Sequence, residues 1–364
     1  KSWHAISPSC SPKQRPLPVN PLLWKGGTLI PLWKGKEPPD LPSAYRSIFV
    51  SNYSTKLYHQ FIRQHLVAKW EPKAGHLQCG GRKGVGVDIA HHVIQCQQAW
   101  VTANAIPSAI LYIDLRAAFY TVIRQTFTAL PCKNQAFMHA MATLGVPMQD
   151  IATLLEAADK ECVTEGLSAH LQKVLHDMMT NTFFTIPGLQ DPCNTTRGTR
   201  PGDPVADILF NLCMTNLLRS FRTCLALHCP IPWLGEEAPV SDFTEASPMP
   251  AEGFVDVTFV DDCAMLVHAP TNQRIEEVIK ALVTCFDQAA QSRGLQVNFD
   301  RGKTELLWNV VGKGAKATKQ TLYTQGNTLT WDHQGHMYRL HVCHAYKHLG
   351  TWTQTKHRHA REVL

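Results

Sequence analysis

Two adjacent aspartates, Asp261 and Asp262, stand between two apolar segments in the stretch FVDVTFVDDCAMLVHA, residues 254–269. This pattern predicts a hairpin of two buried strands with both carboxylates at its tip. Aspartate is a common turn residue, so an ordinary acidic turn is one interpretation. A metal site is the other, because neighbouring carboxylates in a partly desolvated place repel each other and a divalent cation relieves that repulsion. This stretch alone leaves both interpretations open.

A glycine-rich basic loop precedes a helical pattern in RGTRPGDPVADILFNL, residues 197–212. We expect Asp203 to cap this helix and Pro204 to occupy its first turn. The loop contains two glycines and two arginines: Gly198, Gly202, Arg197 and Arg200. Glycines permit close backbone approach and arginines bind phosphate, a combination that suits a nucleic-acid strand. An ordinary helix start with solvated arginines is the alternative.

A third carboxylate, Asp114, ends the strand-like segment of ILYIDLRAAFYTVI, residues 110–123, and Phe119 follows five residues later. By default Asp114 is a turn residue and Phe119 a core residue. In chain order, however, a strand-end aspartate, a glycine-rich loop with its helix and an Asp-Asp hairpin form the layout of a polymerase palm. Such an enzyme needs carboxylates from separate strands, because two magnesium ions hold the attacking hydroxyl and the leaving pyrophosphate.

The composition limits the function classes. The chain has 364 residues, 44% of them hydrophobic, which is enough for two or three packed subdomains. Its formal charge of +6 is compatible with a polyanionic partner but does not require one. The 12 cysteines include no close CxxC pair, and the start does not resemble a signal peptide, so we expect reduced thiols in an intracellular protein, cytoplasmic or nuclear. No apolar run reaches roughly 18 residues, and we expect no membrane insertion.

The elements that position these residues are mixed α and β. Strand-like segments are expected at 29–33 and 109–114. Helical patterns are expected at 54–68, at 86–102 and, after the second strand, up to about residue 180. Residues 230–253 are rich in proline and acids and are interpreted as a surface insertion. Cys224 and Cys229 form the nearest cysteine pair. They lack obvious further ligands, so we interpret them as core residues rather than a zinc site.

The motifs taken together resemble the reverse transcriptase domain, most closely that of non-LTR (LINE-type) retrotransposons, from roughly residue 25 to 352. Besides DLRAAF, TRPGDPVADILFNL and FVDD, the resemblance depends on four further segments. These are IPLWKGK with AYRSI (30–36 and 44–48), QCGGRKG (78–84), GLQVNFDRGKTE (294–305) and YKHLG (346–350).

The resemblance implies an α+β, right-hand polymerase fold with fingers and palm, in which helices flank an antiparallel palm sheet. It assigns residues 1–107 to an irregular amino-terminal segment and the fingers, and 108–340 to the palm. Residues 341–364 would hold the primer grip and the start of a thumb. Because only 14 residues follow Gly350, we expect that thumb to be largely missing.

The resemblance also implies a role for each site residue. Asp114 and Asp261 would ligate two Mg²⁺ ions, or Mn²⁺ in their place, Asp262 would complete the acidic cluster, and Lys303 would protonate pyrophosphate or contact phosphate. The implied substrate-binding residues are Lys34 and Arg46 for the triphosphate, Phe119 as steric gate, Arg200 and Gly202 in the loop, and Tyr346 and Lys347 at the primer. The implied partners are an RNA template, a DNA primer and deoxynucleoside triphosphates.

Three departures from the family pattern leave activity open. Pro201 stands where glutamine is usual and lacks a backbone N–H, Tyr120 replaces an aspartate, and YRSI lacks the usual proline. None of these removes a metal ligand. The leading hypothesis is an RNA-directed DNA polymerase. The alternatives are a catalytically decayed nucleic-acid-binding remnant and an RNA-dependent RNA polymerase, which Phe119 disfavours.

Overall fold

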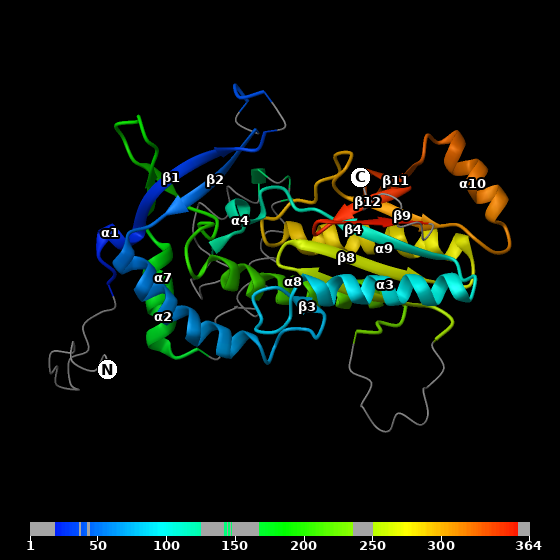
Figure 1. Cartoon of the computed structure of the whole chain (residues 1–364), viewed down its shortest axis with the longest axis horizontal. Coiled ribbons are helices and arrows are strands. Elements are labelled where there is room, and N and C mark those ends of the chain that lie inside the picture. The colour runs from blue at the N-terminus through cyan, green and yellow to red at the C-terminus, as the bar shows by residue number, and fades with distance from the viewer. Residues whose placement is uncertain are drawn as a thin grey trace.

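The largest element of the computed structural model is a seven-stranded sheet with the strand order β10-β11-β9-β4-β8-β7-β3 (Figure 1). The structure describes residues 19–35, 38–41, 44–124, 167–235 and 250–355, with 142, 143, 145 and 147. The strands are β3 (Gln78–Cys79), β4 (Ser108–Ile113), β7 (Gly253–Phe259), β8 (Asp262–His268), β9 (Glu305–Asn309), β10 (Thr328–His333) and β11 (His336–Cys343). The four central strands are antiparallel, whereas β3 and β11 each join a neighbour in parallel.

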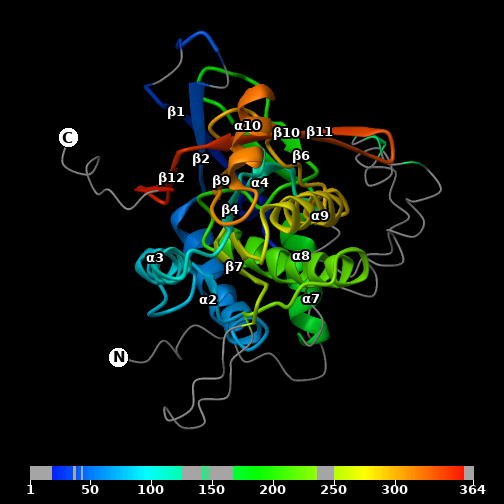
Figure 2. The ribbon, with the colours of Figure 1, turned by 90° about the vertical axis from the view of Figure 1, so that its right-hand side faces the viewer.

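The central strands are buried on both faces. Successive side chains of a strand point to opposite faces, and in β4 Leu111 belongs to one core cluster while Tyr112 belongs to the other. Helices α8 (Ala206–His228) and α9 (Asn272–Gln291) supply the first cluster, and α3 (Val87–Ala103) supplies the second. Figure 2 shows the sheet between α3 on one side and the α8–α9 pair on the other. Burial on both faces explains the nearly continuous apolar sequences AILYI and CAMLV.

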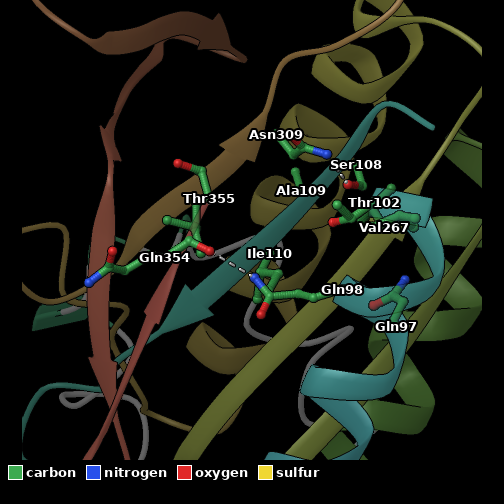
Figure 3. A pocket seen from close by; sticks show the side chains of 12 residues that line it. Gln97, Gln98, Thr102, Ser108, Ala109, Ile110, Val267, Asn309, Gln354 and Thr355 are labelled. Carbon is green, nitrogen blue, oxygen red and sulfur yellow. Dashed lines mark hydrogen bonds between the residues drawn. The ribbon is translucent and has the colours of Figure 1, made fainter. Parts of the chain in front are cut away.

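A two-stranded hairpin extends the second core cluster. It consists of β12 (Ala345–His348) and β13 (Thr351–Gln354), and Tyr346 packs against the cluster that α3 also covers. Gln98 Nε2 of α3 donates to the Gln354 carbonyl at 3.4 Å, beside a cavity of about 20 Å³ (Figure 3). A cavity of this size accommodates about one water molecule. The hairpin is therefore tied to α3 as well as to the sheet.

A smaller sheet, with the order β2-β1-β5-β6, lies at the blue and green end of Figure 1. Its strands are β1 (Gly26–Trp33), β2 (Tyr45–Val50), β5 (Thr182–Thr185) and β6 (Cys193–Thr195). The remaining helices of the described residues are α1 (Leu22–Lys25), α2 (Tyr53–Trp70), α4 (Ala118–Thr121), α7 (Ala169–Met179) and α10 (Ala315–Thr324). A 2.6 Å ion pair between Lys25 and Asp177 joins α1 to α7. Strand β5, inside the range assigned to the palm, thus pairs with the amino-terminal strand β1, and β6 extends the sheet beyond it.

The prediction of a mixed α+β fold is confirmed, and α2, α3 and β4 begin and end within two residues of the expected bounds. Much of the helical region expected up to residue 180 and residues 236–249 of the expected insertion lie outside the described residues. No helix in the described ranges is long and apolar enough to cross a bilayer.

The expected helix cap at Asp203 is wrong, because α8 begins at Ala206 with Val205 in the cap position. The Asp203 carboxylate is instead fully buried between His59 Nδ1, at 2.9 Å, and the Arg200 guanidinium, at 3.1 Å. It also accepts from the Val205 N–H at 3.2 Å. The carboxylate therefore connects the loop to α2 rather than ending the helix.

Asp203→Asn should lower the free energy of unfolding by about 3 kcal/mol, because removing one partner of a buried ion pair leaves the other charge uncompensated. Asp207→Asn, four residues on, is the control. The Asp207 side chain is 38% exposed and pairs with Arg63, so its loss should cost about 1 kcal/mol or less. Urea unfolding measures both values, and equal losses would contradict the structural role of Asp203.

Candidate active site

The Asp-Asp hairpin closes through a two-residue turn. Strands β7 and β8 pair up to Phe259 and Asp262, so Val260 and Asp261 form the turn itself. Val260 has a φ of +60°, a left-handed conformation that a β-branched residue rarely adopts. Glycine is the usual residue at such a position of a tight hairpin. Backbone strain is thus located directly beside the two carboxylates, a feature common at functional sites.

Strand register brings Asp114 to the same end of the sheet. The last pair between β4 and β8 is Ile113 with Cys263, so extending the register by one residue places Asp114 opposite Asp262. Asn298 holds Asp114, because its Nδ2 donates to Asp114 Oδ2 at 3.0 Å and its backbone N–H donates to the Asp114 carbonyl at 2.8 Å. The Asp114 N–H donates to Thr304 Oγ1 at 3.1 Å. Three carboxylates from two separate segments therefore share one sheet end.

The carboxylates perturb one another electrostatically. Burial, followed by the charges of Asp261 and Asp114, raises the pKa of Asp262 to about 6, while Lys303 opposes this shift. Burial and Asp114 likewise raise the pKa of Asp261, and Arg46 acts in the opposite direction. Lys303 Nζ lies 3.4 Å from Asp114 Oδ1. The oxygens of the three aspartates do not all lie within 4.8 Å of one another.

A set of oxygen donors with unbalanced negative charge fits a hard divalent cation. Asp114, Asp261 and Asp262 provide such a set, since each raises the pKa of another or has its own pKa raised by its neighbours. Drawing their oxygens together around an ion would replace repulsion with attraction. The residues at this sheet end are therefore compatible with the predicted magnesium site.

Two basic residues, Arg46 and Lys34, belong to the β1–β2 hairpin. Arg46 is exposed in β2 opposite Leu32, and Lys34 directly follows β1. Because side chains alternate along a strand, Leu32 and Lys34 belong to the same face as Arg46. Arg46 is near enough to lower the pKa of Asp261. This hairpin thus presents cationic side chains on one face, and the charge of one of them, Arg46, acts on the Asp261 carboxylate.

Phe119 is a partly buried residue of α4 that stacks on Phe210, with ring centroids 4.7 Å apart. Its carbonyl accepts from the Thr199 N–H at 2.7 Å. The neighbouring Tyr120, one of the departures from the family pattern, donates its hydroxyl hydrogen bond to the Ser47 carbonyl of β2. Both residues are therefore fixed by backbone contacts, with the Phe119 ring between the core and the surface.

Arg200 and Gly202 contact their own chain. Arg200 is buried, pairs with Asp203, donates to the Lys25 carbonyl at 3.2 Å and lies over the Phe49 ring at 5.5 Å. A Cβ added to Gly202, whose φ is +108°, would lie 2.3 Å from the Phe49 carbonyl oxygen. The close backbone approach that the glycine permits is thus to β2. Substrate contacts by these two residues stay a prediction.

Tyr346 of β12 joins the hairpin to the candidate site. Its ring stacks on Tyr112 with centroids 4.2 Å apart, and its hydroxyl donates to the Lys303 carbonyl at 2.6 Å. Burial, followed by the charges of Asp114 and Asp262, raises the pKa of Tyr346, which reflects its place beside the carboxylates. Lys347 is exposed on the same strand, opposite Trp352.

Sequence reasoning missed several residues that hold the site together. Asn298 and Thr304 orient Asp114, and His59 supports Asp203 from α2. Asn298 and Thr304 fall within GLQVNFDRGKTE, so the motif pointed to the segment without identifying the polar contacts. His59 is 144 positions from Asp203, and no local pattern marks it.

Comparison with known proteins gives structural similarity alone. No family model and no curated protein matches the sequence. Among solved structures, telomerase from Candida tropicalis truncated from its C-terminal domain has a TM-score of 0.47 and 11% identity, covering 86% of this chain and 53% of that one. Apo telomerase from Candida tropicalis has a TM-score of 0.46 and 12% identity, and the match covers 84% of this chain and 46% of that one. Telomerase from Candida albicans with a TWJ fragment of telomeric RNA has a TM-score of 0.43 and 12% identity, and the match covers 80% of this chain and 43% of that one. The chain spans about half the length of these telomerases, and similarity this low does not establish a shared function.

Asp262→Asn should make the protein more stable than the parent near pH 7 in the presence of a chelator. The pKa of Asp262 lies above the usual 3.8, so ionisation disfavours the folded state and stability declines as the pH rises from about 4 to about 6. Asp262→Asn lacks the contribution of Asp262 to this decline, so its free energy of unfolding relative to the parent should increase between about pH 4 and about pH 6. Asp300→Asn is the control, because the Asp300 side chain is 68% exposed. Urea unfolding at several pH values measures the stability of Asp262→Asn and Asp300→Asn. An identical pH dependence in the two variants would contradict an unfavourable ionisation of Asp262.

Proposed function

We propose that this chain is the RNA-directed DNA polymerase domain of a retroelement, which extends a primer 3′-hydroxyl with deoxynucleotides on an RNA template. The observation that supports it most is the register that brings Asp114 opposite the Asp261–Asp262 turn at one sheet end. Carboxylates that converge from separate strands are the donor set that nucleotidyl transfer with two metal ions requires. The seven motifs of the sequence occur in the order of the reverse transcriptase family.

In this proposal Asp114 and Asp261 hold two magnesium ions, and Asp262 adds negative charge beside them. Bound magnesium would activate the primer hydroxyl and neutralise charge on the leaving pyrophosphate. Lys303 would contact or protonate that pyrophosphate, and its distance of 3.4 Å from Asp114 supports this role. Arg46 and Lys34 would bind the triphosphate from the β1–β2 hairpin, because paired cations stabilise phosphate oxygens.

The choice of sugar is assigned to Phe119. Its ring is held against Phe210 on one side and remains partly exposed on the other. A flat ring under the incoming sugar leaves no volume for a 2′-hydroxyl and so selects deoxynucleotides by exclusion. On the other face of the sheet, where Tyr346 packs against the second core cluster, Tyr346 and Lys347 of β12 would position the primer.

Asp261→Asn should reduce extension of a DNA primer on an RNA template by at least about a thousandfold, while primer–template binding changes little. The substitution removes a ligand charge with almost no change in volume. Asp300→Asn serves as the matched control and should retain activity within a few-fold. Labelled primer extension with Mg²⁺ measures the rate, and a filter-binding assay measures affinity. An Asp261→Asn rate close to the parent rate would rule out the metal-site assignment. Binding without extension by the parent would favour the decayed remnant.

Phe119→Val should raise incorporation of ribonucleotides relative to deoxynucleotides by about tenfold or more, with a modest loss of overall rate. The smaller side chain opens volume for the 2′-hydroxyl. Phe184→Val, which alters a partly buried phenylalanine in β5 of the smaller sheet, is the control and should leave the ratio unchanged. Competition between the two nucleotide types measures the ratio. Equal sugar discrimination in the parent and in Phe119→Val would show that Phe119 packs against the core without selecting the sugar.

A further inference from the structure

Two cysteines and a histidine from two helices meet on the side of the sheet covered by α8 and α9. Cys224 and His228 are four residues apart near the end of α8, and Cys285 is in α9. One potential ligand atom from each residue lies within 4.8 Å of the other two. Among the residues that the structure describes, no other group of three His, Cys, Asp or Glu side chains meets this distance. Figure 2 shows the two helices side by side.

We propose that Cys224, His228 and Cys285 form a zinc site that clamps α8 to α9. Two thiolates and an imidazole are the donors that Zn²⁺ prefers, and a tetrahedral ion accepts them with one further position for water. With Zn–S bonds of about 2.3 Å, the ligand atoms of such a site are about 3.5–3.8 Å apart. Because the ligand atoms lie within 4.8 Å of one another, the three side chains need to close by at most about 1 Å, which rotamer adjustment allows.

The surroundings of His228 support a ligand role. Its Nδ1 donates to the Cys224 carbonyl at 2.9 Å, since a carbonyl can only accept. In metal sites the second ring nitrogen of a histidine ligand commonly has such a partner, which fixes the tautomer and leaves the other nitrogen free to bind. The same Nδ1 lies 3.6 Å from Cys224 Sγ, so zinc binding through the free Nε2 needs a rotation of the exposed ring that turns Nε2 towards the two sulfurs. The ring is exposed, so an ion can enter from solvent.

The two thiols differ in burial, and this sets the cost of binding. Cys285 is buried, and burial together with the neighbouring Cys224 raises its pKa, so zinc must displace a proton there. Cys224 is only half-buried, and its thiol contacts the Gln288 Oε1 atom at 3.6 Å. Gln288 in turn contacts His333 at 3.4 Å, which provides further polar atoms at the rim of the site.

The site is separate from the candidate active site. Cys224 is 18 residues after Ala206, the first residue of α8, a distance of about 27 Å along the helix at 1.5 Å per residue. Phe210, which contacts Phe119, is near the start of the same helix. Zinc here would act on structure, by fixing the far end of the helix that carries the glycine-rich loop at its beginning. The inference does not depend on the proposed polymerase activity.

The test uses the whole chain, purified without metal in a non-thiol reductant and titrated with Co²⁺ as a spectroscopic probe. We expect one equivalent to produce Co–thiolate charge-transfer absorption, which stoichiometric Zn²⁺ abolishes by displacement. Zinc should also raise the thermal midpoint. Cys224→Ser and His228→Ala should each weaken Zn²⁺ binding by at least about tenfold, measured against a competing chelator.

A matched control is available on α3, where His92 and Cys96 repeat the four-residue spacing, with Cys96 Sγ 3.4 Å from His92 Nε2, and belong to no such three-residue group. His92→Ala should leave zinc binding unchanged. His228 is exposed, so its substitution should preserve folding even if Cys285→Ala does not. The proposal is overturned if no stoichiometric site is found, or if His228→Ala binds as tightly as His92→Ala.

Discussion

Repulsion between carboxylates held at one sheet end is the constraint on which the rest of the site depends. The register of β4 against β8 fixes where Asp114 and Asp262 meet, and the strained Val260 turn fixes Asp261 beside them. Burial and the charge of Asp114 raise the pKa of both Asp261 and Asp262, so the fold holds these carboxylates in an arrangement that costs it stability. A buried sheet with helices on both faces supplies the rigidity needed to do this.

The surrounding elements form a frame of backbone contacts. Tyr120 bonds to Ser47, Gly202 allows the loop to reach Phe49, and Tyr346 bonds to the Lys303 carbonyl. The first two contacts join α4 and the glycine-rich loop to β2 of the smaller sheet, and the third joins β12 to the segment before β9. The smaller sheet, the glycine-rich loop and β12 are thus all fixed relative to the same sheet end. In the proposed polymerase this frame would align triphosphate, sugar and primer.

Elements with strong periodicity could be predicted from the sequence, because buried strands and amphipathic helices leave local patterns. The order of the motifs could also be read from the sequence. It predicted neither the partner of Asp203 nor the three-residue zinc candidate. His59 is remote in sequence, and Cys285 meets Cys224 only after two helices pack. Local rules favoured Asp203 as a helix cap, but a buried carboxylate is more stable with two basic partners than at a helix start. The burial of Arg200 against Asp203 and Phe49 was not predicted either, because tertiary packing decides which charges reach solvent.

The most direct measurement of the central claim is the location of Mn²⁺, as a substitute for Mg²⁺, by anomalous diffraction from crystals of the chain with primer–template and a deoxynucleoside triphosphate. The account predicts anomalous density between Asp114 and Asp261, with Asp262 adjacent. Density elsewhere on the protein with none between these carboxylates would contradict it.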